Sequence, residues 1–119
     1  MKTVLAAAFL AFGPLAAAQQ WASEFKGSPV QFFDREDHRL LEQTMYSALD
    51  QPSGNRPVTW ENPKTGHKGN IVVVRDFNSK GRDCKELQFN NEAQGRKGDE
   101  RLSFCRIDGK WRALGSSQL

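Results

Sequence analysis

Residues 83–114 decide the fold of this chain and read DCKELQFNNEAQGRKGDERLSFCRIDGKWRAL. The stretch contains both cysteines of the protein, Cys84 and Cys105. When these two residues lie opposite each other on antiparallel strands, the hairpin between them turns at Gln94-Gly95. The spacing therefore predicts two strands joined by a short turn that contains glycine.

This register also sorts the apolar residues of the two strands. It places Leu87 opposite Leu102. Because strand side chains alternate between faces, Phe89 and Phe104 fall on the same side as these leucines, and the cysteines fall on the other side. Two independent features, the cysteine pairing and the leucine pairing, thus agree on one alignment of the strands.

A further hairpin follows at Asp108-Gly109. Asp-Gly between apolar residues is among the strongest short hairpin signals, because both central positions of a type I′ turn need positive φ. Pairing across this turn puts Trp111 on the face that carries Phe104. We expect Trp111, and Trp60 in an earlier strand, to be largely buried.

The most strand-like run of the chain precedes the cysteines. It spans residues 70–77, NIVVVRDF, and a turn at residues 79–81 returns the chain toward Cys84. That turn brings Ile71 and Val73 onto the face of the leucine and phenylalanine residues described above. A coherent apolar face across consecutive strands indicates a core face.

A shorter strand is predicted at residues 58–62, VTWEN. It ends at Pro63, whose ring nitrogen cannot donate to a strand ladder. Residues 63–66, Pro-Lys-Thr-Gly, then form the turn into the next strand. These residues complete a set of five consecutive strands.

The segment from Asp34 to Leu49 has a helical pattern. Asp34 is a good N-cap residue, with Asp37 three positions later, and apolar residues recur at spacings of three to five. The predicted apolar face consists of Leu40, Leu41, Met45, Tyr46 and Leu49. Pro52 and Gly54 end the helix.

The order of these elements predicts an α+β fold: one amphipathic helix packed on a five-stranded antiparallel meander. A tightly curved sheet that approaches a small barrel is the alternative. In that case Gly69, Gly95 and Gly98 mark bulges or bends.

The first residues have the pattern of a secretory signal peptide. A short positive start is followed by an apolar run at residues 4–15 and by three alanines at 16–18. The run is shorter than the roughly 20 residues of a transmembrane span. No cysteine follows it, so we expect neither a membrane span nor a lipid anchor. We expect a signal peptide at 1–18, an N-terminal arm without regular structure at 19–33, one domain at 34–115 and a tail at 116–119.

The charges do not indicate a nucleic-acid partner. Removal of the predicted signal peptide leaves 16 basic and 14 acidic residues. Both signs are interspersed, as in residues 35–39 and 96–101, whereas a nucleic-acid module concentrates Lys and Arg on one face. We therefore expect these charged runs, Asp37 included, to be solvated.

No catalytic or cofactor motif is present. The two histidines are His38, expected on the polar side of the helix, and His67, expected as a solvated turn residue. A metal site that uses His67 with carboxylates is conceivable, but the sequence has no Cys-x-x-Cys, no His-Glu-x-x-His and no phosphate-binding glycine loop. Ser53 and Ser103 lie in no nucleophile elbow. We expect no enzymatic activity and no cofactor.

The pattern from Ala48 to Trp111 resembles the C-terminal domain of the 17 kDa outer-membrane surface antigens. The resemblance rests on the spacing of small, aromatic and turn residues and on the sequence CRIDGKW at the second cysteine. The matching residues are Ala48, Leu49, Ser53, Gly54, Trp60, Asn62, Pro63, Gly66, Gly69, Cys84, Cys105, Arg106, Asp108, Gly109, Lys110 and Trp111. The resemblance implies an envelope or surface location in a Gram-negative-type bacterium and no established enzymatic activity.

Two features of that group are missing. Its members are commonly lipoproteins with a glycine-rich segment before this domain, and this sequence has neither the lipidated cysteine nor the glycine-rich segment. The periplasm or the medium is therefore an expected location beside the outer-membrane surface.

Three functional hypotheses follow. The first is a non-enzymatic exported module that binds a protein or cell-envelope component. The second is a secreted hydrolase inhibitor that acts through an exposed charged loop at residues 94–101. The third is a thiol-based redox or metal protein, but the long spacing of the cysteines favours a cross-strand staple. We therefore predict a disulfide between Cys84 and Cys105.

Overall fold

The computed structural model describes residues 28–54 and 56–114. These residues form a short 3-10 helix, one α-helix and five strands. The elements are η2 (Pro29–Phe32), α2 (Arg35–Leu49), β1 (Val58–Glu61), β2 (Lys68–Ser79), β3 (Arg82–Ala93), β4 (Arg96–Ile107) and β5 (Lys110–Leu114). The predicted signal peptide, the first part of the predicted arm and the predicted tail lie outside the described residues.

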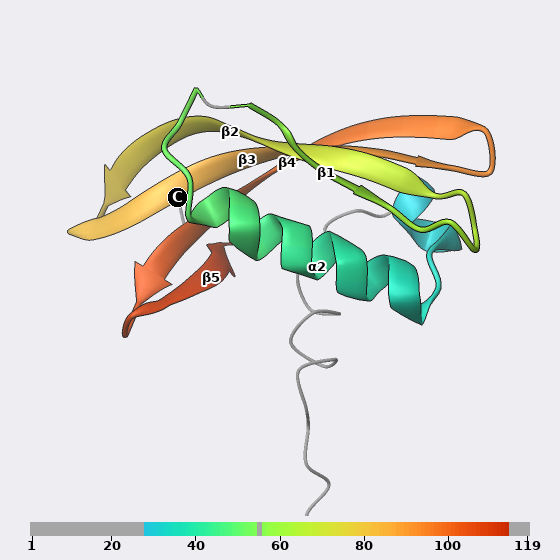
Figure 1. The fold of residues 1–119 in the computed structure, drawn as a ribbon. Helices are drawn as coiled ribbons and strands as arrows, with labels where there is room; N and C mark the ends of the chain where they lie inside the picture. The colour runs from blue at the N-terminus through green and yellow to red at the C-terminus, as the bar shows by residue number, and fades with distance from the viewer. Residues whose placement is uncertain (1–27, 55, 115–119) are drawn as a thin grey trace, which may run out of the picture.

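The five strands form one antiparallel sheet in the order β1-β2-β3-β4-β5, which confirms the predicted meander. The sheet curls, and α2 lies along one of its faces (Figure 1). We call this the helix face and the opposite one the open face. The core between α2 and the sheet includes Leu41, Met45, Ile71, Leu87 and Phe89. No pairing joins β1 to β5 within the described residues, so the sheet is not a closed barrel.

Three two-residue turns set the register of β2 to β5. In each turn both residues have positive φ: 54° and 77° at Lys80-Gly81, 54° and 71° at Gln94-Gly95, and 53° and 76° at Asp108-Gly109. These values match the primed turns whose twist suits a hairpin. Cys84 therefore pairs with Cys105 as predicted, and the apolar pairs between the strands follow from the same register.

The glycines named in the alternative fold do not mark the β-bulge of this sheet. The irregularity in the sheet falls between Val73 and Arg75 of β2, not at a glycine. Gly95 is a turn residue, whereas Gly69 and Gly98 lie in strands. A Cβ atom on Gly98 would lie 2.6 Å from the ring of Pro29, so this glycine lets η2 approach the sheet.

The arm was also predicted without regular structure, and residues 29–32 contradict this. Ser28 caps η2 by accepting a hydrogen bond from the Val30 amide, and Pro29 fits the first helical position. Both Pro29 and Val30 are buried. The proline therefore begins a short helix that packs on the sheet, whereas the sequence predicted that it would interrupt regular structure.

Helix α2 has the predicted N-terminus. Asp34 and Asp37 form a reciprocal capping box, in which each carboxylate accepts the backbone N–H of the other residue. Tyr46 was expected on the apolar face but is exposed, because it follows buried Met45 by only one position and so points away from the sheet. His38 was expected on the polar side, yet it is half-buried and contacts the ring of Phe33.

The two tryptophans that were predicted to be buried, Trp60 and Trp111, differ in burial. Trp60 is 6% exposed, as predicted, and packs edge-on against Phe33. Trp111 is only partly buried, so the prediction of a largely buried side chain was wrong for this residue. It lies on β5, an edge strand, where water reaches one side of the indole, and the guanidinium of Arg106 lies 5.0 Å from its ring centroid.

The structure joins Cys84 and Cys105 in the predicted disulfide, across a sequence separation of 21 residues. We expect the double variant Cys84→Ala with Cys105→Ala to lose about 3 kcal/mol of unfolding free energy, since the bridge restricts the unfolded chain. Urea unfolding under non-reducing conditions measures this loss. Wild type treated with a reductant is the matched control and should unfold at a urea midpoint similar to that of the double variant. If both unfold at the midpoint of untreated wild type, the prediction is contradicted.

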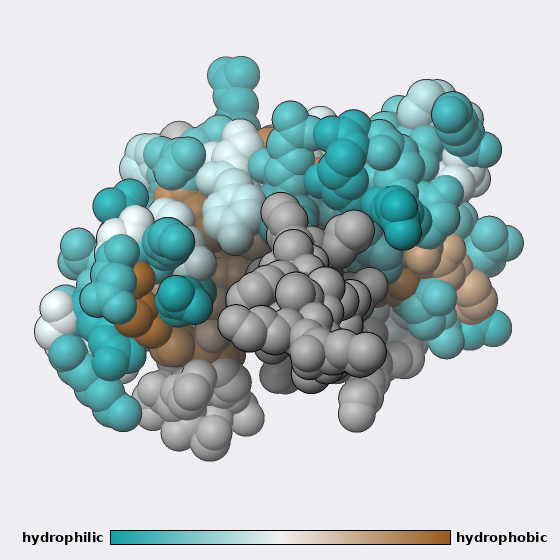
Figure 2. All heavy atoms as spheres, turned by 90° about the horizontal axis from the view of Figure 1, so that it is seen from below, coloured by the Kyte–Doolittle hydropathy of each residue, from teal (hydrophilic) through white to brown (hydrophobic). Residues whose placement is uncertain are grey.

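Figure 2 shows the molecule from the side on which α2 lies. Hydrophilic residues dominate the described surface in this view, and hydrophobic ones form small separate patches. Among the described residues, the exposed large hydrophobic side chains are Phe32 and Tyr46. The guanidinium of Arg96 lies 5.6 Å from the ring centroid of Phe32.

Candidate functional site

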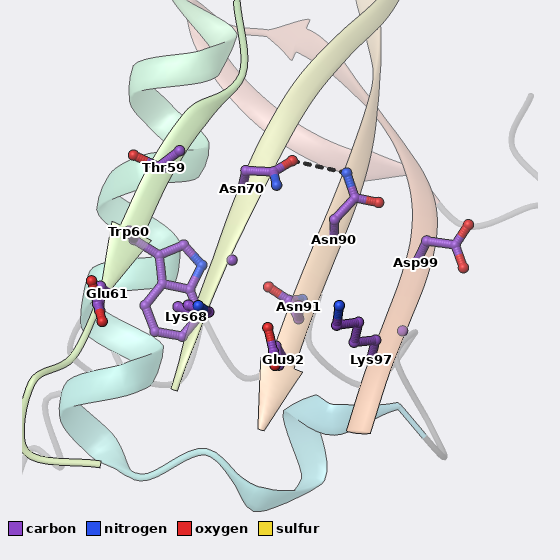
Figure 3. A pocket seen from close by; sticks show the side chains of 12 residues that line it. Thr59, Trp60, Glu61, Lys68, Asn70, Asn90, Asn91, Glu92, Lys97 and Asp99 are labelled. Atoms are coloured by element: carbon purple, nitrogen blue, oxygen red, sulfur yellow. Dashed lines mark hydrogen bonds between the residues drawn. The ribbon is translucent and has the colours of Figure 1, made fainter. Parts of the chain in front are cut away.

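A hollow of about 650 Å³ crosses four strands of the sheet at the end that carries the β1–β2 and β3–β4 turns. Three rows of residues line it, each row taking one residue from β1, β2, β3 and β4 (Figure 3). We call it the sheet hollow. The floor row is Trp60, Gly69, Asn91 and Gly98, the charged row is Glu61, Lys68, Glu92 and Lys97, and the polar row is Thr59, Asn70, Asn90 and Asp99.

The alternation of strand side chains decides which face the hollow occupies. Trp60 and Asn91 of the floor row are buried on the helix face. Their neighbours along each strand, which make up the charged and polar rows, therefore project from the open face. The hollow lies between these two rows, with the backbone of the floor row beneath it.

The charged row alternates in sign from β1 to β4. Register places Glu61 opposite Lys68, Lys68 opposite Glu92, and Glu92 opposite Lys97. Even so, no ion pair or side-chain hydrogen bond joins any of these four side chains to a described residue. Two ammonium and two carboxylate groups thus remain available to a ligand.

The polar row contains a directed chain of amides. Gln88 Nε2 donates to Asn90 Oδ1 at 3.1 Å, and Asn90 Nδ2 donates to Asn70 Oδ1 at 2.8 Å. The Asn70 amino group is the end of this chain and has no acceptor among the described residues. It therefore presents free donors between the Thr59 hydroxyl and the Asn90 amide.

Buried polar atoms without partners lie in the floor row. Trp60 Nε1 and both side-chain polar atoms of Asn91 have no hydrogen-bond partner, although the two residues are 6% and 3% exposed. The indole and the Asn91 amide lie on the two sides of β2 (Figure 3), and both approach Gly69. Unpaired buried groups carry a desolvation cost, so each of them calls for an explanation; Trp111 Nε1 on β5, outside the hollow, is unpaired as well.

Gly69 is required by this convergence. A Cβ atom there would lie 2.5 Å from Asn91 Oδ1, 2.6 Å from the Asn90 backbone oxygen and 2.7 Å from Trp60 Nε1. Because a strand carbonyl cannot move aside cheaply, we expect Gly69→Ala to cost about 1 to 3 kcal/mol of unfolding free energy. Thermal unfolding beside the control Thr59→Ala tests this, and equal midpoints for the two variants would contradict it.

A buried carboxylate links the helix to the turn that enters the hollow. Asp37 is fully buried, and its Oδ1 accepts from Asn62 Nδ2 at 2.8 Å and from the Thr65 hydroxyl at 2.9 Å. Its Oδ2 accepts from the Asp34 amide at 2.9 Å and lies 2.8 Å from His67 Nδ1. Four donors from two elements therefore satisfy one carboxylate.

The hydrogen bonds decide the charge state of Asp37. Burial raises the pKa of its carboxyl, but the bonds from the Asp34 amide, His67, Asn62 and Thr65 outweigh burial and lower the pKa below its ordinary value. Asp37 is thus an ionised, fully paired group at neutral pH. The expectation that it is a solvated charge was wrong.

His67 was also wrongly expected to be solvated; it is 4% exposed. Its Nε2 lies 3.1 Å from Gln94 Nε2, and an amide nitrogen can only donate. Nδ1 faces the ionised Asp37 carboxylate, which can only accept, so Nδ1 carries a proton and donates to Asp37. The sequence showed no sign of this contact, since 30 residues separate the partners and a lone turn histidine has no distinguishing pattern.

The motif residues Asn62, Pro63 and Gly66 build the turn between β1 and β2. Asn62 Oδ1 accepts from the Lys64 amide at 3.0 Å, and the Gly66 amide donates to the Asn62 carbonyl at 2.8 Å. Gly66 has φ of 75°, which favours glycine. These residues, with Trp60 and Gly69, lie together at one end of the hollow, whereas Asp108, Gly109 and Trp111 belong to the separate β4–β5 hairpin.

Residues 94–101, on which the inhibitor hypothesis depends, form the turn of the β3–β4 hairpin and the first part of β4. The turn consists of Gln94 and Gly95 alone, because β4 begins at Arg96. The Gln94 side chain is held against His67. The tip of this hairpin, residues 94–97, is exposed, so the hairpin that the inhibitor hypothesis needs is present and that hypothesis stays a prediction.

Within the described ranges, no group of three or more His, Cys, Asp and Glu residues could hold a metal ion. The contact between Asp37 and His67 therefore belongs to no such group. None of the helices in that part of the chain is long and apolar enough to cross a membrane.

A sequence profile of the 17 kDa outer membrane surface antigens matches residues 47–112. The chain belongs to this family. The matched range includes all three rows of the sheet hollow and the disulfide, but it excludes η2 and most of α2. Asp37 thus lies outside the matched range, although three of its partners lie inside it.

One relative is the 17 kDa surface antigen of Rickettsia prowazekii (strain Madrid E). It is 30% identical over 83 residues, which cover 68% of this chain and 52% of the relative. This chain therefore spans about half the length of the curated relative that it matches. No solved structure matches the chain.

Proposed function

We propose that this protein is a non-enzymatic, exported module of the bacterial envelope and that it binds a protein or cell-envelope component in the sheet hollow. The observation that carries the proposal is the concentration of unpaired polar groups around one hollow. The charged row offers four unpaired ionised groups, and the polar row ends in a free amide donor. Convergent polar groups in a concave site are typical of binding sites.

Membership of the surface antigen family supports the envelope location. The N-terminal pattern of a positive start, an apolar run and three alanines supports export, with the signal peptide at 1–18 as its expected form. The disulfide fits an oxidising compartment such as the periplasm or the cell surface. A module held there meets cell-wall, membrane and extracellular components.

The test is a crosslinking pull-down from envelope extract with the exported protein and two arginine variants. Asn70→Arg places a long side chain in the hollow. Ser79→Arg is the matched control, because Ser79 lies on the same strand and the same face but near the far end of the sheet. We expect wild type and Ser79→Arg to capture a common partner and Asn70→Arg to lose at least about 90% of it.

Thermal unfolding of the three proteins accompanies the pull-down, so that loss of capture is distinguished from loss of fold. Equal capture by Asn70→Arg and wild type would refute the hollow as the binding site. Capture that is lost with Ser79→Arg as well would place the contact elsewhere on the open face, which also contradicts the proposal.

A further inference from the structure

The charges of the sheet hollow are complementary to the same charges in reverse order; this step rests on the proposed function above. The charged row reads negative, positive, negative, positive from Glu61 on β1 to Lys97 on β4. A two-fold axis that runs along the strands, midway between β2 and β3, reverses this order in a second copy of the sheet. We propose that the partner in the hollow is a second copy of this chain, bound open face to open face.

Under this axis each charge of the row meets its opposite. The central strands place Lys68 opposite Glu92 of the second copy, and symmetry repeats the pair in the other direction. The outer strands place Glu61 opposite Lys97 of the second copy in the same way. A two-fold axis that runs across the strands would instead place each charge opposite its own equivalent. Charge complementarity therefore selects the axis along the strands.

The polar row agrees with the same axis, which places Asn70 opposite Asn90 of the second copy and Thr59 opposite Asp99 of the second copy. The free amino group of Asn70 can donate to the Asn90 side-chain oxygen, which has a second lone pair beside the bond that it accepts from Gln88. The Thr59 hydroxyl can donate to the Asp99 carboxylate. Two rows of different chemistry thus support one arrangement.

The spacing and shape of the sheet suit this contact. Neighbouring strands lie about 4.8 Å apart in both copies, so all four charges of a row match the facing row at once. Two sheets of the same twist that meet along a common strand direction pack as in a β-sandwich. Because the sheet curls toward α2 (Figure 1), the edges of the open faces diverge. The central pair of Lys68 and Glu92 should therefore contribute most.

An anionic polymer fits the hollow less well than a second copy. The charged and polar rows together contain the three carboxylates of Glu61, Glu92 and Asp99 against the two ammonium groups of Lys68 and Lys97. A chain of repeated negative charges would meet more repulsion than attraction there. Since exposed ion pairs are weak and screened by salt, we expect a weak dimer that dissociates as the salt concentration rises.

The test is sedimentation equilibrium of the exported protein at low salt, with one charge reversed at either central position. Lys68→Glu places two carboxylates opposite each other in the dimer, and Glu92→Lys places two ammonium groups opposite each other. Each variant alone should dimerise at least about tenfold more weakly than wild type. An equimolar mixture of the two variants should form a mixed dimer with nearly the wild-type affinity, because every charge in it again meets its opposite.

Lys110→Glu is the matched control. It makes the same charge change on the same face, but on β5, which contributes nothing to the hollow. We expect this variant to dimerise like wild type. Thermal unfolding of all the variants shows that each one is folded.

The outcomes separate this inference from the proposed function. A wild type that stays monomeric up to about 1 mM, a mixture that associates no better than its components, or an equal loss with Lys110→Glu would overturn the inference. If Asn70→Arg then still lost its envelope partner in the pull-down above, the hollow would bind a different component and the proposed function would stand. Unchanged capture by Asn70→Arg would instead remove the proposed function on which the inference rests.

Discussion

Trp60→Ala should lose about 3 to 5 kcal/mol of unfolding free energy, most of the stability of a domain of this size. The indole is 6% exposed, and it packs edge-on against Phe33 with 5.1 Å between ring centroids. It also lies against Gly69, whose missing side chain leaves no atoms that could fill the space. Removal of the ring therefore leaves a cavity that its neighbours cannot close. Urea unfolding of the purified variant measures the loss.

The matched control is Trp111→Ala, the same substitution at a half-buried tryptophan on the edge strand β5. We expect it to cost clearly less than Trp60→Ala, because water already reaches part of the Trp111 ring. Equal losses for the two variants would show that the burial of Trp60 does not govern its contribution to the unfolding free energy. A wild-type midpoint for Trp60→Ala would contradict the prediction outright.

The sheet could be predicted because its register is encoded locally. Two-residue turns with glycine in second position admit one backbone geometry, and each turn fixes the pairing of a whole hairpin. Cys84 with Cys105, and Leu87 with Leu102, then test that pairing independently. The N-terminus of α2 is likewise local, since Asp34 and Asp37 are only three residues apart.

The contacts between distant segments could not be predicted in the same way. Asp37 meets His67 only because α2 packs beside the β1–β2 turn, and neither residue has a neighbour in sequence that announces this. The partial exposure of Trp111 depends on what covers β5, and periodicity carries no information about that. The packing of η2 through Gly98 is a contact of the same kind.

The sheet hollow lies between these two cases. Once the register of β1 to β4 is known, the alternating charged row can be written down from the sequence: Glu61, Lys68, Glu92 and Lys97. A strand-by-strand inspection misses it, because each strand contributes one unremarkable surface charge. The pattern appears only across the strands, so the pairings must be assembled before the row can be recognised.

Asp37→Asn should also lose several kcal/mol of unfolding free energy at neutral pH, about 1 to 3 kcal/mol for each buried donor that is left without an acceptor. Its carboxylate accepts from the Asp34 amide, Asn62, Thr65 and His67 in a fully buried position. An amide retains the shape of the side chain but replaces one accepting oxygen with an NH2 group. This NH2 group then faces at least one of the donors that the carboxylate accepted from. Asp34→Asn is the matched control and should cost less, because Asn is also a good N-cap residue.

Wild type and Asp37→Asn also supply a test by pH. The pKa of Asp37 is lowered in the folded state, so its ionised form contributes stability above its unfolded pKa of about 3.9. That contribution disappears as the pH falls from 3.9 through the lower folded-state pKa. The difference in unfolding free energy between wild type and Asp37→Asn should therefore shrink as the pH falls below about 4. A difference that grows on acidification would show that the hydrogen bonds do not favour the charged form.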